Sequence, residues 1–400
     1  MILVATALFA PEPVVSANLS YDIALELSSK NDVVVVSPKP SRPYGMKFDD
    51  KNKLKYPFNH IILDSYVCPE SKVFGRLRES YSFGKHLRRY IEDNHKKISI
   101  IYANVWPLFS QKHLAEVASE FKIPLILHVQ DVYPESLSKK VKTFGALIDK
   151  AFLPMDRKNL HATHKIVTIS NQMKNYLAQT RDIEESKIAV IRNWQNDSSF
   201  IKFQSKHDSY KNKKFFFLYL GTINPTASID LLIHAFGKSN LTDACLIIAG
   251  DGADKQRCIQ IAEGYASDIR FMNVSPDEVP EVQSKADVLL LPLKKGVAGT
   301  ALPSKMTAYM FSGKPILASI DRDSEAANII EKNTCGWVVE PENEQQLIDS
   351  MTRALITNSR LLKKMGENSL EYAMTHLSRK SNLRTLISII EEANRSQVRC

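Results

Sequence analysis

The sequence predicts an α/β protein built from two doubly wound, Rossmann-like domains. Short, continuously apolar runs such as "DVVVVS" (32–37) and "ADVLLLPL" (286–293) alternate with segments of helical periodicity along the chain. Strands that are apolar on both faces and separated by helices are typical of parallel sheets covered on both sides. The 400 residues exceed one compact core, and the strand–helix rhythm restarts after a polar, basic stretch at 195–214.

The first half of the chain predicts one such domain, at residues 1–200. A β-α-β rhythm opens it, and apolar runs continue to "KIAVIRNW" at 187–194. The expected linker follows at 201–214. The expected strands are 2–9, 32–37, 61–63, 98–103, 124–129, 165–169 and 187–194, and the expected helices include 16–29, 110–121 and 171–179.

The second half predicts a similar domain at residues 215–375, followed by a C-terminal helical segment, 376–400, that could pack back on the first domain. Ligands of doubly wound sheets bind at the carboxyl ends of the strands. Two facing domains therefore predict a site in the cleft between them. The expected strands are 215–221, 244–252, 269–274, 286–293, 314–319 and 336–340, with helices at 227–239, 253–265, 277–284, 304–312 and 379–395.

Composition favours a soluble protein of a reducing compartment. Apolar residues make up 44% and charged residues 24% of the chain, which is ordinary for a globular protein. No apolar stretch approaches the length of a spanning helix, and the opening "MILVATALFA" lacks a basic region and reads as a first strand rather than a signal peptide. The five cysteines form no Cys-x-x-Cys pair, which argues against a disulfide framework or a zinc site.

Two segments, 71–97 and 137–160, concentrate the excess positive charge. The first has eight Lys or Arg against three Asp or Glu, and the second has six against two, with apolar residues such as Leu147 and Phe152 among the lysines. A basic helix with exposed apolar residues can lie on an anionic bilayer. The alternative is a solvated helix whose apolar stripe packs into its own domain. Nucleic acid is the weaker hypothesis, because no recognisable binding module accompanies the charge.

Three strand-to-helix loops of the second half predict a phosphate ligand. Glycines let the backbone approach a ligand closely, and helix N-termini offer free N–H groups. "LPSK" adds a hydroxyl and an ammonium in a first helical turn, which suits a diphosphate. Neither GxGxxG nor GxxxxGK[ST] occurs, so a dinucleotide site or P-loop is disfavoured. The candidate donor-site residues are Gly221, Thr222, Asn224, Gly250, Gly252, Gly296, Gly299, Ser304 and Lys305.

These residues belong to stretches that resemble a known family along almost the whole chain. "FAPEPVVSANLSYDIALEL", "HVQDVYPESL", "VIRNWQNDSSF", "LYLGTINPTASIDLLIHAF", "IIAGDG" and "LPSKMTAYMFSGKPILAS" follow one another in the order seen in family 4 glycosyltransferases of the GT-B fold. The likeness is to the branch that builds bacterial O-antigens and capsules, and the chain is similar to N-acetyl-fucosamine transferases within it.

The resemblance implies a retaining, hexosyltransferase-type enzyme of lipopolysaccharide or capsule biosynthesis. Its second domain would bind a nucleotide-sugar as a substrate, usually UDP-linked, with no cofactor and no metal. Helix dipoles and Lys305 would then stabilise the departing diphosphate. The acceptor would be a lipid-diphosphate-linked or other saccharide bound by the first domain. The enzyme would be cytoplasmic and peripheral on the inner membrane, docked through 71–97 and 137–160, with no nucleic acid as a partner.

The chain departs from the family pattern at two positions. Family members often carry two glutamates eight residues apart, where this sequence has Thr300 and Ala308. Glu325 is the nearest acid downstream and is our candidate for a sugar or ribose contact. The family's Arg and Lys after the "YLG" strand are also missing, which leaves Lys305 as the chief cation expected at the diphosphate.

Candidate acceptor-side residues follow strands of the first domain. Asp131 or Glu135 could orient or deprotonate an acceptor hydroxyl, although Glu135 could instead complement a helix dipole. His128 is a contact candidate or a satisfied core histidine. Glu12 and Trp106 complete the acceptor-side set, and Trp106 could stack on a sugar or fill the core.

Two other functions stay open from the sequence. A nucleotide-sugar 2-epimerase shares the two-domain fold but needs several acid or base residues around the sugar, and the donor loops are poor in them. Loss of both family glutamates also fits a degenerate, non-catalytic assembly partner, whereas the retained Lys305, glycine loops and "DVYPES" stretch oppose it.

Overall fold

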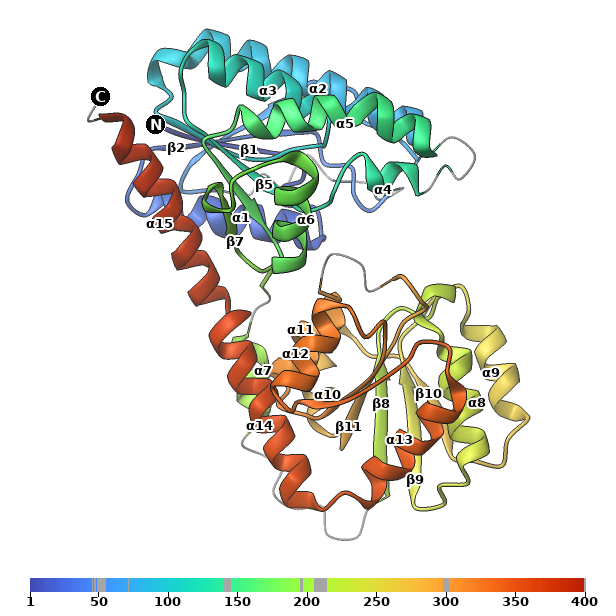
Figure 1. Ribbon diagram of the computed structural model, residues 1–400. Helices are drawn as coiled ribbons and strands as arrows, with labels where there is room; N and C mark the ends of the chain where they lie inside the picture. The colour runs from blue at the N-terminus through green and yellow to red at the C-terminus, as the bar shows by residue number, and fades with distance from the viewer. Residues whose placement is uncertain are drawn as a thin grey trace. The chain divides into compact units, whose positions relative to one another are not determined.

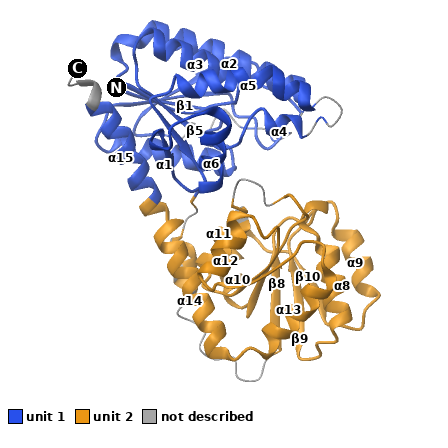
Figure 2. Cartoon of the chain, in the orientation of Figure 1, with its two compact units in different colours: residues 1–193, 382–400 blue, residues 194–381 orange. Residues whose placement is uncertain are grey.

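The computed structural model describes residues 1–44, 46, 48, 55–70, 72–139, 141, 145–194, 197–204, 214–297 and 302–398. The chain divides into two compact units (Figure 2). Unit 1 comprises Met1–Asn193 together with Asn382–Cys400, and unit 2 comprises Trp194–Ser381. Most of the expected linker, 201–214, lies outside the described residues.

Unit 1 is organised around a seven-stranded sheet with the order β3-β2-β1-β4-β5-β6-β7, in which every pair is parallel. The central strands are continuous apolar runs because helices cover both of their faces. The strands are β1 Ile2–Thr6, β2 Val33–Pro38, β3 Asn59–Leu63, β4 Ile100–Asn104, β5 Leu125–Val129, β6 Lys165–Thr168 and β7 Ile188–Val190.

Helices α2, α3 and α5 lie on one face of this sheet, and α1 and α6 lie on the other (Figure 1). The long helix α2 buries Phe83, Leu87 and Ile91, one residue on each successive turn. The helices of unit 1 are α1 Val15–Ser28, α2 Val73–Asn94, α3 Phe109–Glu120, α4 Glu135–Ser138, α5 Gly145–His161, α6 Asn171–Arg181 and α15 Arg379–Val398, the last beginning in unit 2.

Unit 2 contains a second parallel sheet, of six strands in the order β10-β9-β8-β11-β12-β13. The strands are β8 Phe215–Leu220, β9 Ala244–Ala249, β10 Ile269–Met272, β11 Val288–Pro292, β12 Ile316–Ser319 and β13 Gly336–Val339. The helices are α7 Ser198–Gln204, α8 Ile229–Ser239, α9 Lys255–Glu263, α10 Val279–Ser284, α11 Ser304–Phe311, α12 Glu325–Lys332, α13 Glu344–Ile356 and α14 Ser359–His376.

The strands of unit 2 contribute side chains to two separate hydrophobic cores, one on each face of the sheet. Along β11, Leu289 and Leu291 join the core under α11, α12 and α14, whereas Val288 and Leu290 join the core under α8 and α13. This alternation follows from the two-residue period of a strand. Both units are therefore doubly wound α/β structures, as the sequence predicts.

Two sequence-based expectations are wrong in detail. The strand expected at 187–194 pairs only over Ile188–Val190, because its single neighbour β6 ends at Thr168. The helix expected across 137–160 is interrupted: α4 ends at Ser138 and α5 begins at Gly145. A Cβ at Gly145 would lie 2.9 Å from the Ser138 carbonyl oxygen, so α5 restarts against the end of α4 rather than continuing it.

Candidate functional site

A hollow of about 130 Å³ lies at the carboxyl edge of the unit 1 sheet. Between β1 and β4 the strand order reverses, so the connections leaving these two strands diverge and open a crevice. Three of the predicted acceptor-side residues, Trp106, His128 and Asp131, line this hollow together. The full lining is Ala7, Leu8, Ser16, Arg76, Asn104, Val105, Trp106, Pro107, Gln111, His128, Gln130, Asp131 and Tyr133.

His128, on β5, is held in a neutral hydrogen-bonded chain. Its Nε2 lies 3.1 Å from the amide nitrogen of Gln130, whose oxygen accepts a hydrogen bond from Asn193. The amide nitrogen therefore donates to Nε2, and Nδ1–H donates to the Tyr102 hydroxyl, 2.6 Å away. Burial lowers the pKa of His128 to about 4, so the ring is uncharged at neutral pH. Both ring nitrogens are therefore engaged by the protein, and the ring carries no charge to an acceptor.

A second, smaller hollow of about 50 Å³ shares Arg76, Trp106, Pro107 and Tyr133 with the first. The guanidinium of Arg76 lies 5.4 Å from the centroid of the Trp106 ring, within cation–π range. The indole N–H of Trp106 is buried and has no acceptor among the described residues. The remaining lining of this hollow is Val73, Leu77, Ser80, Leu108 and Leu137, which is mostly apolar.

Asp131 and Glu135, on the loop after β5, have different surroundings. Asp131 is exposed at the rim of the larger hollow and accepts a hydrogen bond from the Ser136 hydroxyl. Glu135 begins α4 and lines neither hollow. Of these two carboxylates, Asp131 is therefore the one placed to meet a ligand in this crevice.

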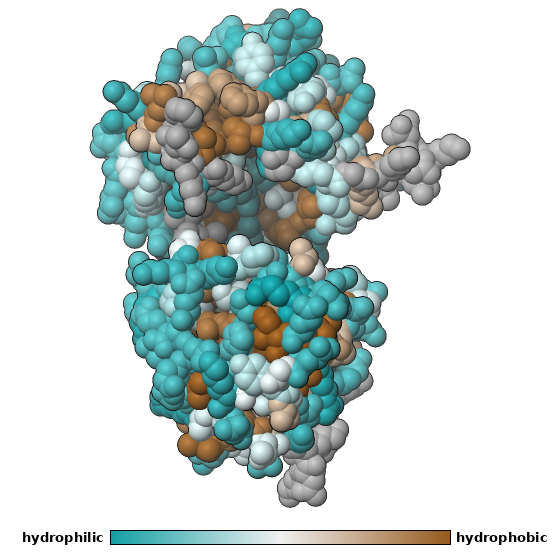
Figure 3. All heavy atoms as spheres, turned by 90° about the vertical axis from the view of Figure 1, so that its right-hand side faces the viewer, coloured by the Kyte–Doolittle hydropathy of each residue, from teal (hydrophilic) through white to brown (hydrophobic). Residues whose placement is uncertain are grey.

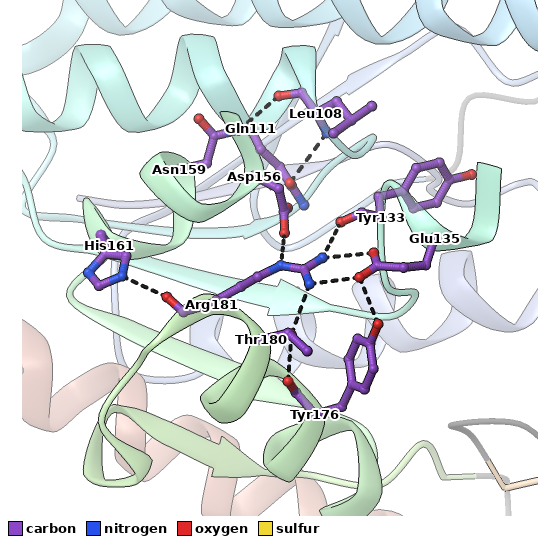
Figure 4. Close-up of polar contacts among 10 residues, drawn as sticks. All are labelled: Leu108, Gln111, Tyr133, Glu135, Asp156, Asn159, His161, Tyr176, Thr180 and Arg181. Carbon is purple, nitrogen blue, oxygen red and sulfur yellow. Dashed lines mark hydrogen bonds and ion pairs between the residues drawn. The ribbon is translucent and has the colours of Figure 1, made fainter. Parts of the chain in front are cut away.

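The carboxylate of Glu135 belongs to a buried polar cluster around Arg181 (Figure 4). Arg181 is fully buried at the end of α6 and donates 2.7 Å hydrogen bonds to both Glu135 oxygens. It also donates to Asp156 on α5 and to the Tyr133 carbonyl, each at 2.8 Å. The Tyr176 hydroxyl adds a 2.9 Å bond to Glu135. The cluster thus ties the loop that carries Asp131 and Tyr133 to α5 and α6.

Glu12 is also engaged by the protein itself. It is 4% exposed, and its two oxygens accept hydrogen bonds from the backbone N–H groups of Phe9, Ser41 and Arg42. Burial raises the pKa of Glu12, and the three N–H donors oppose that shift. The residue fastens the loop after β1 to the loop after β2, and it lines neither hollow.

In unit 2, Lys305 and Gly221 meet at the corresponding point of the sheet. The strand order reverses between β8 and β11; Gly221 directly follows β8, and Lys305 lies in the first turn of α11, the helix after β11. A Cβ at Gly221 would lie 1.9 Å from Cε of Lys305, and Gly221 has φ +151°. The positive φ favours glycine here, and a Cβ would displace the lysine side chain that crosses the end of β8.

Lys305 is a partly buried cation with no counter-charge in the described residues. Its ammonium lies 5.4 Å from the centroid of the Tyr219 ring, and no described residue forms a hydrogen bond or ion pair with it. Burial lowers the pKa of Lys305. A desolvated ammonium is costly without an anion, so this position favours an anionic ligand.

Two tyrosines fix the surroundings of Lys305. Tyr309, one turn further along α11, exchanges hydrogen bonds with the N–H and C=O of Leu220 at 2.9 and 3.1 Å. These bonds attach α11 to the end of β8. The Tyr219 hydroxyl donates a 2.6 Å bond to the carbonyl of Thr222, which shapes the loop beneath the ammonium.

Gly250 and Gly252 are explained by the packing of two loops against each other. A Cβ at Gly250 would lie 2.0 Å from the carbonyl oxygen of Gly221, and one at Gly252 would lie 2.1 Å from that of Ile223. The loop after β9 therefore runs directly against the loop after β8. These glycines bring the two loops together at the carboxyl edge rather than clearing space for a ligand.

Other predicted donor residues are partly committed to local structure. The Asn224 side-chain oxygen caps the following turn by accepting from the N–H groups of Thr226 and Ala227. The N–H of Gly296 donates a 2.8 Å bond to the Asp321 carboxylate, so it is already used. Thr222 is exposed at the edge. Asn224 and Thr222 keep donors that a ligand could use, whereas the Gly296 N–H does not.

The remaining donor-side positions are only partly described. Ser304 opens α11, and Gly299 and Thr300 lie outside the described residues. Ala308, where the family often has a glutamate, is 8% exposed within α11. Glu325 is the first residue of α12, whose N-cap Ser324 accepts from the Ala327 N–H.

No group of three or more His, Cys, Asp or Glu side chains in the described ranges is arranged to hold a metal ion. Likewise, none of the helices that the structure describes is long and apolar enough to cross a membrane.

The sequence-based reasoning missed Arg76, Arg181 and Tyr309. Arg76 stands in a segment that reads only as basic, and its alignment with Trp106 depends on tertiary packing. Arg181 comes at the end of a helix, where a cation ordinarily complements the dipole, so nothing in the pattern indicates burial. Tyr309 gives no signal at all beyond its place in an apolar run.

Comparisons with known proteins agree with this arrangement. Residues 17–198 match the family model "Glycosyltransferase Family 4", and residues 200–372 match "Glycosyl transferases group 1". The chain is 25% identical over 279 residues to the "Putative colanic acid biosynthesis glycosyl transferase WcaI" of Escherichia coli K12, covering 66% of this chain and 67% of WcaI.

Solved structures show the same fold at low identity. Sucrose-phosphate synthase from Thermosynechococcus elongatus aligns with a TM-score of 0.73 at 14% identity, over 99% of both chains. Anabaena Alr3699/HepE, solved in complex with UDP, aligns with a TM-score of 0.63 at 15% identity, over 98% of this chain and 99% of HepE. The two family models meet end to end along this chain, and each covers one of the two doubly wound units. The chain therefore belongs to the family 4, group 1 glycosyltransferases, and its fold is GT-B.

Proposed function

We propose that the protein transfers a sugar, with retention of anomeric configuration, from a UDP-linked donor to a lipid-diphosphate-linked or other saccharide acceptor. The donor sugar is an N-acetylated amino sugar, and the pathway is O-antigen or capsule biosynthesis. The observation that carries the proposal is the environment of Lys305. Its ammonium is partly buried and has no partner among the described residues, and it lies at the edge of the unit 2 sheet, where the predicted donor loops converge.

In this proposal the donor diphosphate lies against Lys305 and the loop after β8. The bond between the anomeric carbon and the diphosphate oxygen breaks, and the ammonium of Lys305 offsets the charge that develops on that oxygen. The acceptor hydroxyl oxygen forms the new bond to the anomeric carbon. Its proton leaves to a base, for which Asp131 is the carboxylate at the rim of the unit 1 hollow. No bound metal is needed, because protein cations and N–H groups carry the anion.

The comparisons support the donor and the pathway. HepE is solved with UDP, and also with UDP-glucose. WcaI is named for colanic acid biosynthesis, and WbjE of Pseudomonas aeruginosa, 25% identical over 247 residues, is named a probable glycosyltransferase. WbjE is matched over 59% of its own length.

Attachment to an anionic membrane surface is part of the proposal. In the basic segments, Phe74 at the start of α2 is 86% exposed and Leu147 in α5 is 65% exposed. Figure 3 views the side of the molecule that carries α4, and hydrophobic side chains gather on the surface of unit 1 there. Exposed apolar side chains among lysines and arginines suit the boundary between headgroups and acyl chains. A lipid-linked acceptor would be met at that surface by a cytoplasmic, peripheral enzyme.

The test begins with donor binding and then measures turnover. In isothermal titration calorimetry, the affinity for UDP should fall at least about 10-fold in Lys305→Met, because the contact between the ammonium and the phosphate is lost. Lys285→Met is the matched control, because Lys285 is an exposed lysine paired with Glu281 on α10.

With a UDP-linked N-acetylated amino sugar and a lipid-diphosphate-linked saccharide, Lys305→Ala should lose turnover by orders of magnitude. Near-normal kinetics would refute the role of Lys305.

The same samples separate the alternatives. Conversion of a UDP-sugar to its epimer without any acceptor, followed by NMR, would favour a 2-epimerase. UDP binding without turnover on lipid-linked and free saccharide acceptors would favour a non-catalytic assembly partner. The anomeric proton coupling constant of the product, read by NMR, decides between retention and inversion.

A further inference from the structure

The two hollows of unit 1 differ in polarity and meet at one cation. The larger hollow presents hydrogen-bonding side chains from Ser16, Asn104, Gln111 and Gln130, with Asp131 at its rim. The smaller hollow is lined mainly by Val73, Leu77, Leu108 and Leu137. Arg76, Trp106, Pro107 and Tyr133 line both. A ligand that filled both hollows would therefore be polar at one end and apolar at the other, with a guanidinium between the two.

Arg76 is half-buried and, unlike the nearby buried Arg42, has no carboxylate within ion-pair distance among the described residues. Arg42, which also lies over the Trp106 ring at 5.3 Å, forms a 2.8 Å ion pair with the buried Glu79. Within the described ranges, the Arg76 guanidinium forms no ion pair or side-chain hydrogen bond; it lies over the Trp106 ring and is near enough to Glu79 for their charges to interact. A planar guanidinium with free N–H groups is the side chain best suited to two phosphate oxygens.

The position of Asp131 decides where an anion can lie. Its carboxylate lies at the rim of the larger hollow and does not line the smaller one, so it repels a phosphate placed at the rim of the polar hollow. At the junction, the guanidinium of Arg76 attracts the phosphate. An alkyl group attached to that phosphate then has the apolar hollow beside it.

We propose that Arg76 binds an acidic phosphate of the acceptor at the junction of the two hollows, with the acceptor saccharide in the polar hollow and the attached hydrocarbon in the apolar one. The inference rests on the proposed function, and it names the chemistry that unit 1 recognises: a saccharide joined through phosphate to an aliphatic chain. Arg76 is then the residue that distinguishes such an acceptor from a neutral glycoside.

The first test measures binding, so that it does not depend on turnover. n-Octyl phosphate is titrated into the full chain by calorimetry, with 1-octanol and inorganic phosphate as the two halves of the probe. We expect octyl phosphate to bind at least about 10-fold more tightly than either half, and Arg76→Gln to lose about 10-fold or more of that affinity. Arg76→Lys should keep part of it.

Arg78→Gln is the matched control. Arg78 lies two residues along the same helix, is exposed, stacks on Tyr66 at 4.3 Å and lines neither hollow. We expect its octyl phosphate affinity to stay within about 2-fold of the parent chain, because only a contact in the hollows should matter. Equal losses in the two variants would overturn the proposal, since they would indicate a diffuse effect of helix charge. Unchanged binding by Arg76→Gln would overturn it as well.

The second test distinguishes binding of the acceptor from binding of membrane lipid and from binding of the donor. Arg76→Gln should raise KM at least about 10-fold for a phosphate-linked alkyl saccharide and leave KM for the matching alkyl glycoside within about 2-fold. UDP affinity, a property of unit 2, should be unchanged. If Arg76→Gln instead lowers binding to phosphatidylglycerol vesicles while its octyl phosphate affinity is kept, Arg76 contacts membrane lipid and the proposal fails. Absence of UDP binding in the parent chain would refute the proposed function, whereas intact UDP binding with unchanged octyl phosphate binding would refute the inference alone.

Discussion

The guanidinium of Arg181 donates one hydrogen bond to each carboxylate oxygen of Glu135, with both N···O distances at 2.7 Å. Arg181 is fully buried, and the same guanidinium holds Asp156 and the Tyr133 carbonyl. The loop between β5 and α4 is thereby anchored at two points, on either side of Pro134. We infer that Glu135 acts by placing this loop, and that Asp131 is the carboxylate left to face an acceptor.

Removing Arg181 should destabilise unit 1 strongly. In Arg181→Met, the carboxylates of Asp156 and Glu135 lose their cation, and breaking such a buried pair costs about 3–5 kcal/mol. Urea unfolding followed by tryptophan fluorescence measures the loss. Arg157→Met is the control, because its ion pair with Asp182 is on the surface and contributes about 0–1 kcal/mol. Equal losses in both variants would contradict a structural role for the buried cluster.

His128 should make unit 1 sensitive to mild acid. Burial lowers its pKa to about 4 in the folded protein, from the ordinary histidine value of 6.5. The stability that His128 contributes is thus present above about pH 6.5 and is lost as the pH falls toward 4, because the unfolded chain takes up a proton that the folded chain resists. His128→Gln should lessen that loss by about 3 kcal/mol at pH 4. Urea unfolding at pH 7 and pH 4 tests it. If the variant loses as much stability between these pH values as the parent chain, the ring can be protonated in place.

Gly221 and Gly296 should respond differently to alanine. A Cβ at Gly221 would collide with Cε of Lys305, whereas a Cβ at Gly296 would meet no atom within 4 Å. Both have positive φ, so each substitution costs roughly 1 kcal/mol of backbone strain. Gly221→Ala should also displace the ammonium and weaken UDP binding at least about 10-fold. Calorimetry with UDP on both variants makes the comparison, and equal affinities would show that Lys305 does not contact the diphosphate.

The affinity for UDP should fall in alkaline solution. Burial lowers the pKa of Lys305, so its ammonium is lost at a lower pH than that of an exposed lysine. A bound diphosphate stabilises the ammonium, so deprotonation of the free enzyme weakens binding. Lys305→Arg keeps its charge throughout this range and should show a flatter profile. Calorimetric titrations with UDP between about pH 7 and pH 10 test this. If the affinity falls equally with pH in the two proteins, Lys305 does not contact the diphosphate.

Phe74 and Leu147 should contribute to membrane binding. Replacing both by serine removes exposed apolar surface from the basic segments without touching a core. Binding to phosphatidylglycerol vesicles in a sedimentation assay should drop at least about 10-fold. Ile356→Ser, at an equally exposed apolar side chain in α13 of unit 2, should have little effect. If all variants sediment alike, the basic segments are solvated helices rather than a docking surface.

More of the fold than of the candidate site could be predicted from the sequence. The parallel strands could be located because each is a short apolar run between helical patterns, and their errors lie at the ends, as at β7. Lys305 could be predicted as a phosphate ligand because a lysine in the first turn of a helix after a glycine loop is a local pattern. The reason for the glycines at 250 and 252 could not be predicted, because the loop that packs against them is more than 25 residues away in the chain.

The sequence by itself determined the two doubly wound domains and the family, since strand periodicity and motif order are properties of neighbouring residues; it also predicts Lys305 as the cation of the donor site. The tertiary structure alone decided which polar groups remain available. Glu12 and Glu135 are equally plausible ligand contacts in the sequence, yet backbone N–H groups and Arg181 satisfy them. Arg76 reads as one basic residue among eight, yet it lines both hollows and its guanidinium forms no ion pair with the described residues. Whether a charged group is satisfied depends on partners that folding brings from distant parts of the chain, and a local pattern cannot record them.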